Sequence, residues 1–405
     1  MTLPSRIYLD HHATTPVDPR VIDAMAPFWS EAYGNTASWH VFGREASEAV
    51  EEARDTVGAA IGAEAKAMVF TSGATESVNL ALQGVWAFHQ GKGQHVVTTR
   101  TEHPAVFDCC RSMEKKGCEL TVLPVDEFGR VDPEAIREAI TEKTILISVI
   151  HANNEIGTIN DLAAIGRIAK ERAVLFHCDA AQSLGKVKLD VEAMGIDLLS
   201  LSAHKAYGPK GIGALYCRRR DPRVRLEPFL HGGGHERGLR PGTLNAPGIV
   251  GFGKACEIAR QESEEEAIRV SALRDLLERE ITGSLEGVTR NGHSTETLPG
   301  NLNLSFAGVD GMDLLRELPE IALSLGSACT SAVPEPSRVL RAIGVSAELA
   351  GASIRFGVGR FNSEEEIRQA ASRVKKVVLM LRERGNRGES KANEADDSCL
   401  LGTEN

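Results

Sequence analysis

One lysine in this sequence stands where its amine could do covalent chemistry. The apolar run at residues 198–201 predicts a buried strand, and Ser202, His204 and Lys205 follow it directly. A lysine amine has a pKa of about 10.4 in water, so it is costly to bury as a charge. One solution is an imine with an aldehyde cofactor, most commonly pyridoxal phosphate (PLP). The alternative is a surface lysine that pairs with a carboxylate.

Three other polar clusters follow predicted strands, and each has a functional and a structural interpretation. The small residues of TSGATE, which begins at Thr71, could leave helix-start amides free for a phosphate, or could form an ordinary helix cap. His103 could stack on an aromatic ring, act as a base, or be a simple loop residue. Asp179 could pair with a protonated pyridine nitrogen, or form a salt bridge or cap. Together with Lys205, these clusters supply the four groups that PLP needs, so they predict a PLP site.

Composition limits the class of protein. The chain has 405 residues, 42% hydrophobic and 25% charged, as expected for a globular enzyme with more than one core. The formal net charge of −10 argues against direct binding to nucleic acid or to an anionic membrane. We expect neither a signal peptide nor a membrane span. The 8 cysteines form no CxxC pair, so we expect reduced thiols, no intrinsic metal site and a cytoplasmic location.

The first part of the chain alternates between strand and helix patterns. Such alternation with nearly continuous apolar strands indicates a parallel-rich sheet with helices on both faces. Functional sites in these sheets lie at the carboxyl ends of the strands. The predicted strands are 7–9, 68–71, 95–99, 120–123, 144–150, 174–178 and the strand at 198, and the predicted helices are 19–29, 41–61, 75–89, 104–116, 133–140 and 162–171.

The alternation stops at residue 245, where a long helical region to about residue 285 begins. The last helix starts at a capping box of Ser363 and Glu366, and Gly385 ends it. We therefore predict an α/β large domain, residues 15–255, and a smaller α+β domain formed by residues 1–14 and 256–385. Residues 386–405 are polar and predict a disordered tail.

From about residue 7 to residue 382 the sequence resembles the cysteine desulfurases of the class V aminotransferase group. The matching stretches are LDHHATTPVDPRV, VFTSGATESVNLAL, TEHPAV, HANNEIGTINDL, DAAQSLGK, SAHKAYGPKGIGALY, HGGGHERGLRPGT, SLGSACTSAVPEPSRVLRA and SIRFGVGR. The resemblance implies the PLP-dependent transferase fold type I, with a mostly parallel seven-stranded sheet in the large domain. It also implies PLP as cofactor, L-cysteine as substrate and a homodimer.

The resemblance further implies a role for each matching residue. Lys205 would bind the PLP aldehyde, His103 would stack on the pyridine ring, and Cys329 would accept the sulfur. Substrate carboxylate binding would fall to Arg355 and Asn35. The other cofactor contacts would be made by Ala74, Thr75, Ser202 and His204 at the phosphate, Asp179 at the ring nitrogen, Gln182 and Asn154 near the ring hydroxyl, and Thr243 at the phosphate of the partner subunit.

The sequence around Cys329 supports its role independently. It lies among Gly, Ser, Ala and Thr residues that precede two prolines, which predicts an exposed, mobile loop at about 324–336. A free thiol on such a loop is otherwise a liability, and the alternative is an incidental surface cysteine. Cys329 could also be a transient iron–sulfur ligand. The other cysteines are expected to be small core residues, except Cys399 in the tail.

The predicted function is a PLP-dependent cysteine desulfurase that converts L-cysteine to L-alanine and carries the sulfur as a persulfide on Cys329. The sulfur acceptor would be an iron–sulfur scaffold, a tRNA-thiolating protein or a DNA-phosphorothioation partner. One alternative is a selenocysteine lyase or an aminotransferase on the same fold. The other is a scaffold subunit that keeps the fold without turnover.

Overall fold

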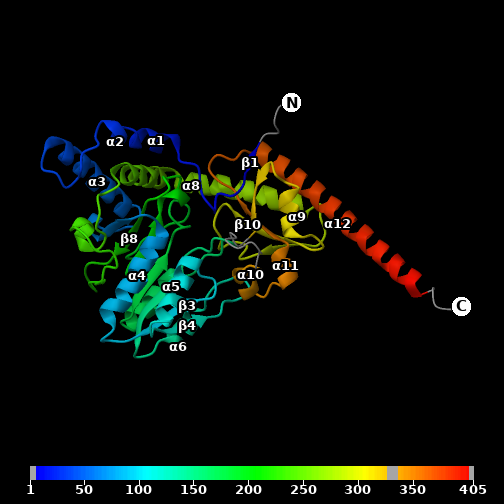
Figure 1. The fold of residues 1–405 in the computed structure, drawn as a ribbon, viewed down its shortest axis with the longest axis horizontal. Helices are drawn as coiled ribbons and strands as arrows, with labels where there is room; N and C mark the ends of the chain where they lie inside the picture. The colour runs from blue at the N-terminus through cyan, green and yellow to red at the C-terminus, as the bar shows by residue number, and fades with distance from the viewer. Residues whose placement is uncertain (1–5, 326–335, 401–405) are drawn as a thin grey trace.

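A seven-stranded sheet forms the centre of the larger part of the molecule (Figure 1). The computed structural model describes residues 6–325 and 336–400, with side chains up to residue 385. In spatial order the strands are β2 (Met68–Thr71), β8 (Gly213–Cys217), β7 (Leu198–Ser202), β6 (Leu175–Asp179), β5 (Thr144–Ile150), β3 (His95–Thr99) and β4 (Glu119–Leu123). In this sheet β8, which the sequence analysis missed, is antiparallel to both neighbours, and the other pairs are parallel. The predicted mostly parallel α/β sheet is confirmed.

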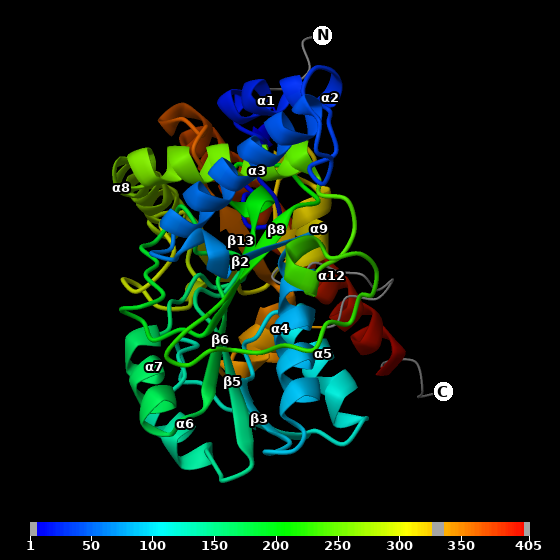
Figure 2. The same ribbon diagram turned by 90° about the vertical axis from the view of Figure 1, so that its left-hand side faces the viewer.

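Helices cover both faces of this sheet (Figure 2). One face packs against α3 (Val41–Ala59), α6 (Pro133–Ala139), α7 (Leu162–Glu171) and the first part of α8 (Ala246–Thr282), and the other against α4 (Ala74–His89) and α5 (Pro104–Glu114). In α7 the buried residues Leu162, Ile165 and Ala169 recur every three or four positions, so one stripe of this helix faces the sheet.

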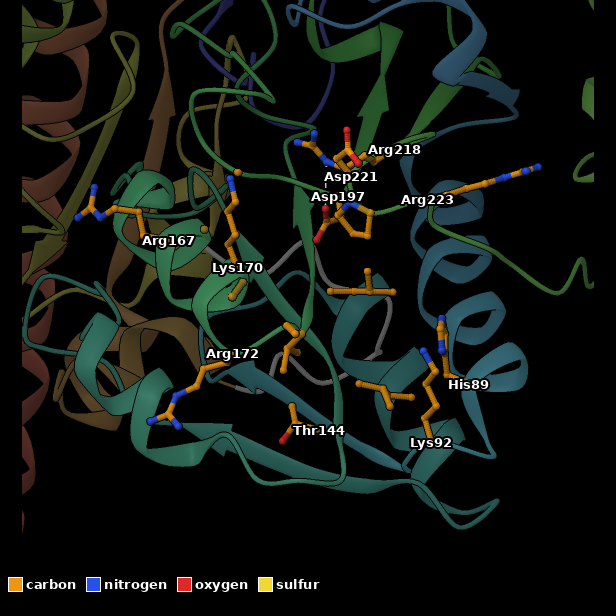
Figure 3. Close-up of a pocket in the computed structure, with 18 of the residues that line it drawn as sticks. His89, Lys92, Thr144, Arg167, Lys170, Arg172, Asp197, Arg218, Asp221 and Arg223 are labelled. Atoms are coloured by element: carbon orange, nitrogen blue, oxygen red, sulfur yellow. Dashed lines mark ion pairs between the residues drawn. The ribbon is translucent and has the colours of Figure 1, made fainter.

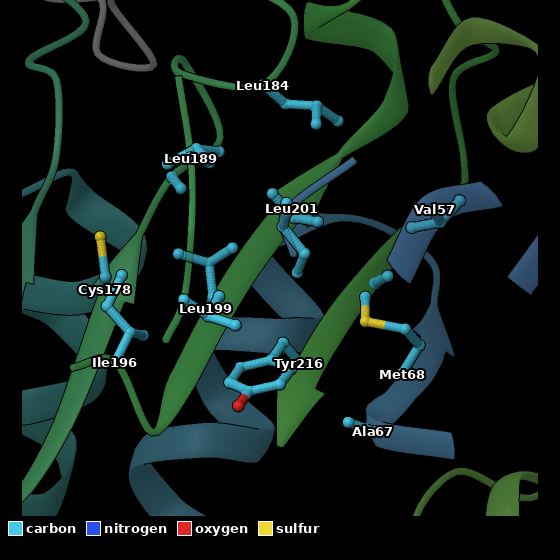
Figure 4. Close-up of a cluster of buried hydrophobic side chains, with 14 of the residues drawn as sticks. Val57, Ala67, Met68, Cys178, Leu184, Leu189, Ile196, Leu199, Leu201 and Tyr216 are labelled. Atoms are coloured by element: carbon cyan, nitrogen blue, oxygen red, sulfur yellow. The ribbon is translucent and has the colours of Figure 1, made fainter. Parts of the chain in front are cut away.

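The middle of the sheet is buried on both sides. Leu199 and Leu201 of β7 pack in the cluster that includes Tyr216 (Figure 4), whereas Leu198 joins the cluster beneath α4 and α5. A strand with two buried faces has a continuous apolar sequence instead of an alternating one. The strand therefore ends where the sequence becomes polar, at residues 202–205, and these residues emerge at the edge of the sheet.

A second, antiparallel sheet forms the smaller part of the molecule. Its strands, in spatial order, are β12 (Ser324–Leu325), β13 (Ser353–Gly357), β10 (Asn301–Phe306) and β9 (Val288–Asn291), and β1 (Ile7–Tyr8) pairs with β11 (Ile321–Ala322) nearby. The single helix α8 contributes Phe252 to the core of the large sheet and Leu277 to the second core. The predicted domain boundary at residues 255–256 thus falls inside one continuous helix.

The remaining elements are short. They are α1 (Pro19–Met25), α2 (Pro27–Ser30), α9 (Gly311–Arg316), α10 (Arg338–Ala342), α11 (Ala347–Gly351) and the 3-10 turns η1 (Ala65–Ala67), η2 (Ala203–Lys205) and η3 (His235–Gly238). The helix predicted at 19–29 is divided in two because Pro27 has no N–H to continue the first helix, and it begins α2 instead.

The last helix is longer than the sequence analysis predicted. α12 runs from Glu364 to Leu400, past Gly385, so residues 386–400 are helical where a disordered tail was expected. This stretch is rich in Glu, Lys and Ala, which favour helix, and a glycine in a helix costs only about 1 kcal/mol. In Figure 1 the end of α12 extends away from the rest of the molecule. None of the helices in the described residues is long and apolar enough to cross a membrane.

Candidate active site

Polar side chains gather at one edge of the seven-stranded sheet. Because β5, β6 and β7 are parallel, their carboxyl ends meet at this edge, where Asp179 ends β6 and Ser202 ends β7. His103 follows β3 as the residue that caps α5, and Lys205 ends the short turn η2 after β7. The topology thus brings together side chains that are far apart in the sequence, at the edge where sheets of this type carry their sites.

The amine of Lys205 is held by two backbone carbonyl groups. Its Nζ donates to the carbonyl oxygen of His12 at 2.6 Å and to that of Ala13 at 2.7 Å. Burial lowers the pKa of Lys205 to about 8, and the positive charge of Arg355 acts in the same direction. At neutral pH this amine is therefore uncharged far more often than a surface lysine. The uncharged amine is the form that attacks an aldehyde.

His103, Asp179 and Lys205 lie within electrostatic range of one another. Burial lowers the pKa of His103, the Asp179 carboxylate opposes this shift, and Lys205 reinforces it. Nδ1 of His103 accepts the backbone N–H of Ala105 at 3.1 Å, so the neutral ring carries its proton on Nε2. Asp179 is buried, and its Oδ1 accepts the N–H of Ala181 at 3.0 Å. The structure therefore brings the predicted amine, ring neighbour and nitrogen partner to one place.

The start of α4 offers room for an anion at the same edge. Ala74 and Thr75 form its first turn, and the preceding residue, Gly73, provides no side-chain cap for the free amides there. A Cβ built on Gly73 would lie 3.9 Å from Oγ of Ser202, so a side chain at this position would enter the space between that hydroxyl and the helix start. His204, whose Nδ1 lies 3.1 Å from Oγ1 of Thr14, is two residues further along the chain.

Gln182 and Lys205 share one hydrogen-bond acceptor. Its Nε2 donates to the carbonyl oxygen of His12 at 2.9 Å, and its Oε1 accepts from Nζ of Lys186 at 3.2 Å. Asn154 takes part through its backbone, because its carbonyl oxygen accepts from Arg355.

Arg355 occupies a fully buried position on β13. Its Nη2 pairs with Oδ1 of Asp10 at 2.8 Å, its Nη1 donates to the carbonyl oxygen of Asn154 at 3.0 Å, and its Nε has no partner among the described residues. Since its charge lowers the pKa of Lys205, Arg355 adds a positive charge to the surroundings of that amine. A guanidinium so placed suits a carboxylate, with Asp10 as the competing anion.

Three predicted residues are not seen in this cluster. Asn35 is exposed, and its Oδ1 accepts the N–H of Ala37 at 3.0 Å. Thr243 is also exposed. Cys329 lies outside the described residues. The cluster seen within one chain therefore contains the proposed cofactor contacts except Thr243, and it does not contain Asn35.

The sequence analysis gave no role to several titratable residues that the structure places here. Asp10 and His12 come from the stretch LDHHATTP, which was matched only as a whole, and Lys186 ends the stretch DAAQSLGK. Glu102, next to His103, is buried, and burial raises the pKa of its carboxyl group to about 8. The sequence signal that could have identified these residues is that titratable side chains stand directly beside apolar strands.

A cavity of about 810 Å³ lies at the opposite edge of the same sheet (Figure 3). It is lined by the first residues of β5 and β6, including Thr144, and by residues that follow the antiparallel β8. Figure 3 shows Lys170 and Lys92 on opposite sides of this space, with Asp197 and Arg218 above it. None of the residues predicted to form the site lines this cavity.

The residues at the carboxyl edge fit PLP. An uncapped helix start beside a buried hydroxyl suits its phosphate, a buried carboxylate suits its ring nitrogen, and an amine of lowered pKa suits its aldehyde. Within the described ranges, no group of three or more His, Cys, Asp or Glu side chains is arranged to hold a metal ion.

Known proteins share both the sequence and the fold. The family model "Aminotransferase class-V" matches residues 7–369. A cysteine desulfurase IscS of Anaeromyxobacter dehalogenans is 56% identical over 378 residues, 93% of each chain. A solved NifS-like protein is 36% identical with a TM-score of 0.86, over 93% of this chain and 100% of the other. A structure of SspA in complex with cysteine is 35% identical with a TM-score of 0.77, over 88% of this chain and 100% of the other. The chain belongs to the class-V aminotransferase family and, within it, to the PLP-dependent cysteine desulfurases.

Proposed function

We propose that this protein converts L-cysteine to L-alanine, with Lys205 as the lysine that binds PLP and Cys329 as the sulfur acceptor. The observation that carries the proposal is the meeting of Lys205, His103 and Asp179 at one sheet edge, where burial lowers the pKa of Lys205 to about 8. L-cysteine as substrate is supported by the structural relative that was solved in complex with cysteine.

The chain's own residues divide the work as follows. PLP, when bound, supplies an electron sink next to the α-carbon of the amino acid. Asp179 holds a negative charge at the ring nitrogen, and Gln182 presents its amide to the ring hydroxyl. The amine of Lys205, partly uncharged at neutral pH, takes the α-proton of the substrate and returns a proton to the product.

Arg355 binds the substrate carboxylate in this proposal. Its buried guanidinium can form two parallel hydrogen bonds with a carboxylate, and its charge is already held near Lys205 by Asp10. The substrate carboxylate would replace part of the interaction between Arg355 and Asp10. The guanidinium of Arg355 would then remain paired with a carboxylate before and after the substrate binds.

Sulfur leaves the substrate by attack of a thiolate. The thiolate of Cys329 attacks the sulfur of the substrate, the new S–S bond forms as the C–S bond breaks, and the electron pair on carbon takes up a proton to give alanine. The six described cysteines are buried, and burial raises the pKa of the thiols, to about 12 for Cys109 and about 11 for Cys118. Such thiols are weak nucleophiles at neutral pH, which supports an acceptor elsewhere in the chain.

The structure sharpens the role of His103. The sequence analysis considered a base as one of its possible roles. Because Nδ1 already accepts the N–H of Ala105, the neutral ring presents an N–H from Nε2 and no free lone pair. His103 can act as a base only after this hydrogen bond breaks, so we propose that it first serves as a ring neighbour and hydrogen-bond donor.

The sulfur acceptor and the assembly state complete the proposal. We expect a cytoplasmic homodimer that transfers sulfur to an iron–sulfur scaffold or to a tRNA-thiolating protein. Support for a second copy comes from Trp29, Tyr33 and Trp39, which are 68%, 65% and 94% exposed around Asn35. Aromatic groups of this kind favour burial against a partner.

The nucleophile is tested by replacing Cys329 with serine and Cys399 with serine as the matched control. Alanine and sulfide released from L-cysteine, and the persulfide on the protein, are measured by mass spectrometry and thiol labelling. We expect Cys329→Ser to abolish the persulfide while Cys399→Ser retains it. Normal sulfide release by Cys329→Ser would contradict the proposal, and formation of a keto acid in place of alanine would favour an aminotransferase.

A further inference from the structure

A small cavity lies beside Lys186, the residue that donates a hydrogen bond to Gln182. It has a volume of about 20 Å³, enough for about one water molecule, and its lining includes His11, His12 and Lys186. Both ring nitrogens of His11 and Nε2 of His12 are buried without a hydrogen-bond partner in the part of the chain that the structure describes. Buried polar groups are normally satisfied, so a water molecule in this cavity is the expected partner of these nitrogens.

Lys186 is the charged member of this network. Its Nζ donates to Oε1 of Gln182 at 3.2 Å, which is its only side-chain acceptor among the described residues. Burial lowers the pKa of Lys186 to about 7, Lys205 acts in the same direction, and Glu266 opposes the shift. Glu266 also lines the cavity, but its Oε2 accepts from Arg360 at 2.8 Å. Below pH 7 the amine is therefore an ammonium group that faces the Gln182 amide.

Lys186 and the backbone of His12 favour the same orientation of the Gln182 amide, whose Oε1 also lies 3.3 Å from Nδ1 of His12. An ammonium group can only donate, so it selects the carbonyl oxygen of the amide. On the other side the carbonyl oxygen of His12 can only accept, so it selects the NH2 group, at 2.9 Å. The NH2 group consequently points to the side where the same carbonyl oxygen holds Nζ of Lys205. A flipped amide would place its oxygen against the His12 carbonyl and its NH2 group against the ammonium.

We propose that Lys186 is a positioning residue that locks the Gln182 amide so that its NH2 group faces the ring hydroxyl of PLP. This inference rests on the proposed role of Gln182. The water that fits the cavity would accept a hydrogen bond from the amine of Lys186. It could also form hydrogen bonds with the unpartnered nitrogens of His11 and His12. Lys186 thus acts on the cofactor only through Gln182, and its effect must depend on the ring hydroxyl.

The test compares the affinity of the full-length protein, stripped of cofactor, for PLP and for a PLP analogue in which hydrogen replaces the ring hydroxyl. Equilibrium dialysis at pH 6 keeps Lys186 charged. We expect Lys186→Met to bind PLP about tenfold more weakly than the wild type, as expected for one charge-assisted hydrogen bond. With the analogue, the two proteins should agree within about twofold.

Three further variants separate positioning from a general structural effect. Lys186→Arg keeps a donor and should stay within about threefold of the wild type for PLP. Lys188→Met, an exposed lysine two residues further on, should stay within about twofold. Adding Lys186→Met to Gln182→Leu should cause no further loss, because the amide that Lys186 holds is already absent. If Lys186→Met does not fold, Lys186→Gln takes its place, and the same hydroxyl-dependent loss, of about threefold, is expected.

Two results would overturn the inference. One is an equal loss of affinity for PLP and for the analogue, and the other is an unchanged affinity of Lys186→Met for PLP. The proposed function fails separately, if the wild type loaded with PLP forms no alanine from L-cysteine.

Discussion

The two edges of the seven-stranded sheet differ in how their charged side chains are buried and paired. At the carboxyl edge, burial lowers the pKa values of His103 and Lys205, and the charge of Asp179 opposes both shifts. The amino edge carries a cavity of about 810 Å³ whose lysines are exposed. The buried Arg218 at this cavity is paired with Asp197 at 3.0 Å. The candidate site is marked instead by Lys205, an amine of lowered pKa that is held by backbone carbonyl oxygens and has no ion-pair partner among the described residues.

The basic residues of the amino-edge cavity have a structural explanation. In a β-α unit the helix starts at the carboxyl edge and ends at the amino edge, where its dipole is negative. His89 lies in the last turn of α4 and Lys170 in the last turn of α7. These side chains complement the helix ends, whereas the carboxyl edge has the free amides at the start of α4. The same topology therefore makes one edge suitable for an anionic cofactor. At the other edge, basic side chains already balance the negative ends of the helix dipoles.

Replacing one lysine at each edge gives the strongest test of the difference between the edges. We expect Lys205→Ala to lose the visible absorption of bound PLP and to lower alanine formation at least about 1000-fold, because no other amine replaces it. Lys170→Ala should stay within about twofold, since this exposed side chain only lines the other cavity. Equal losses in the two variants would remove the distinction between the edges.

A carboxylate from each edge gives the second test. Asp179→Asn should lower kcat about 100-fold, because the negative charge at the ring nitrogen is lost. Without this charge the pKa of His103 should also fall further, since Asp179 opposes the effect of burial, and NMR titration of the histidine measures this shift. Glu142→Gln, an exposed residue at the amino-edge cavity, is the control and should leave both quantities unchanged. An unaltered kcat in Asp179→Asn would contradict the assignment.

The pH dependence of PLP capture tests the burial of Lys205 directly. Burial lowers its pKa to about 8, so the reactive neutral amine is lost as pH falls below 8 and gained as pH rises through it. The rate at which the cofactor-free protein captures PLP should rise about tenfold from pH 7 to pH 9 and then level off. A lysine with a pKa of about 10.4 would instead give a rise of about 100-fold without a plateau. Stopped-flow absorbance measures the rate.

The smallest effect on activity is expected from the buried ion pair at the amino edge. Arg218→Met leaves Asp197 buried without its partner, so the free energy of unfolding should fall by about 3 kcal/mol in urea titrations. The activity of the folded fraction should change less than about twofold. Arg223→Met, an exposed residue of the same cavity, should change neither value. A loss of turnover in folded Arg218→Met would show that the amino edge contributes to catalysis.

Local sequence patterns predicted much of the sheet and part of the site. Leu198, Leu199 and Leu201 are apolar because β7 is buried on both faces, and this pattern located both the strand and the end from which Lys205 emerges. The strand-end positions of Asp179 and His103 followed in the same way. The single helix α8 was harder to predict because its two halves face two different cores, so no single apolar stripe runs along it.

Contacts between distant segments could not be read from local patterns. Asp10 meets Arg355 across 345 positions of the sequence. The carbonyl oxygen of His12 meets Lys205 across 193 positions and Gln182 across 170. Gly385 stopped the predicted helix because glycine usually ends helices, but α12 continues through it.

The sequence alone determined the parallel strands of the large sheet, the chemical groups available and the edge of the sheet to which they belong. It could do so because a continuous apolar run ends where each buried strand ends. Only the tertiary structure decided which carbonyl groups hold Lys205, which carboxylate balances Arg355 and how far burial lowers the pKa of the lysine. These depend on segments that meet only in the folded chain, where removal of water makes each charge sensitive to its neighbours.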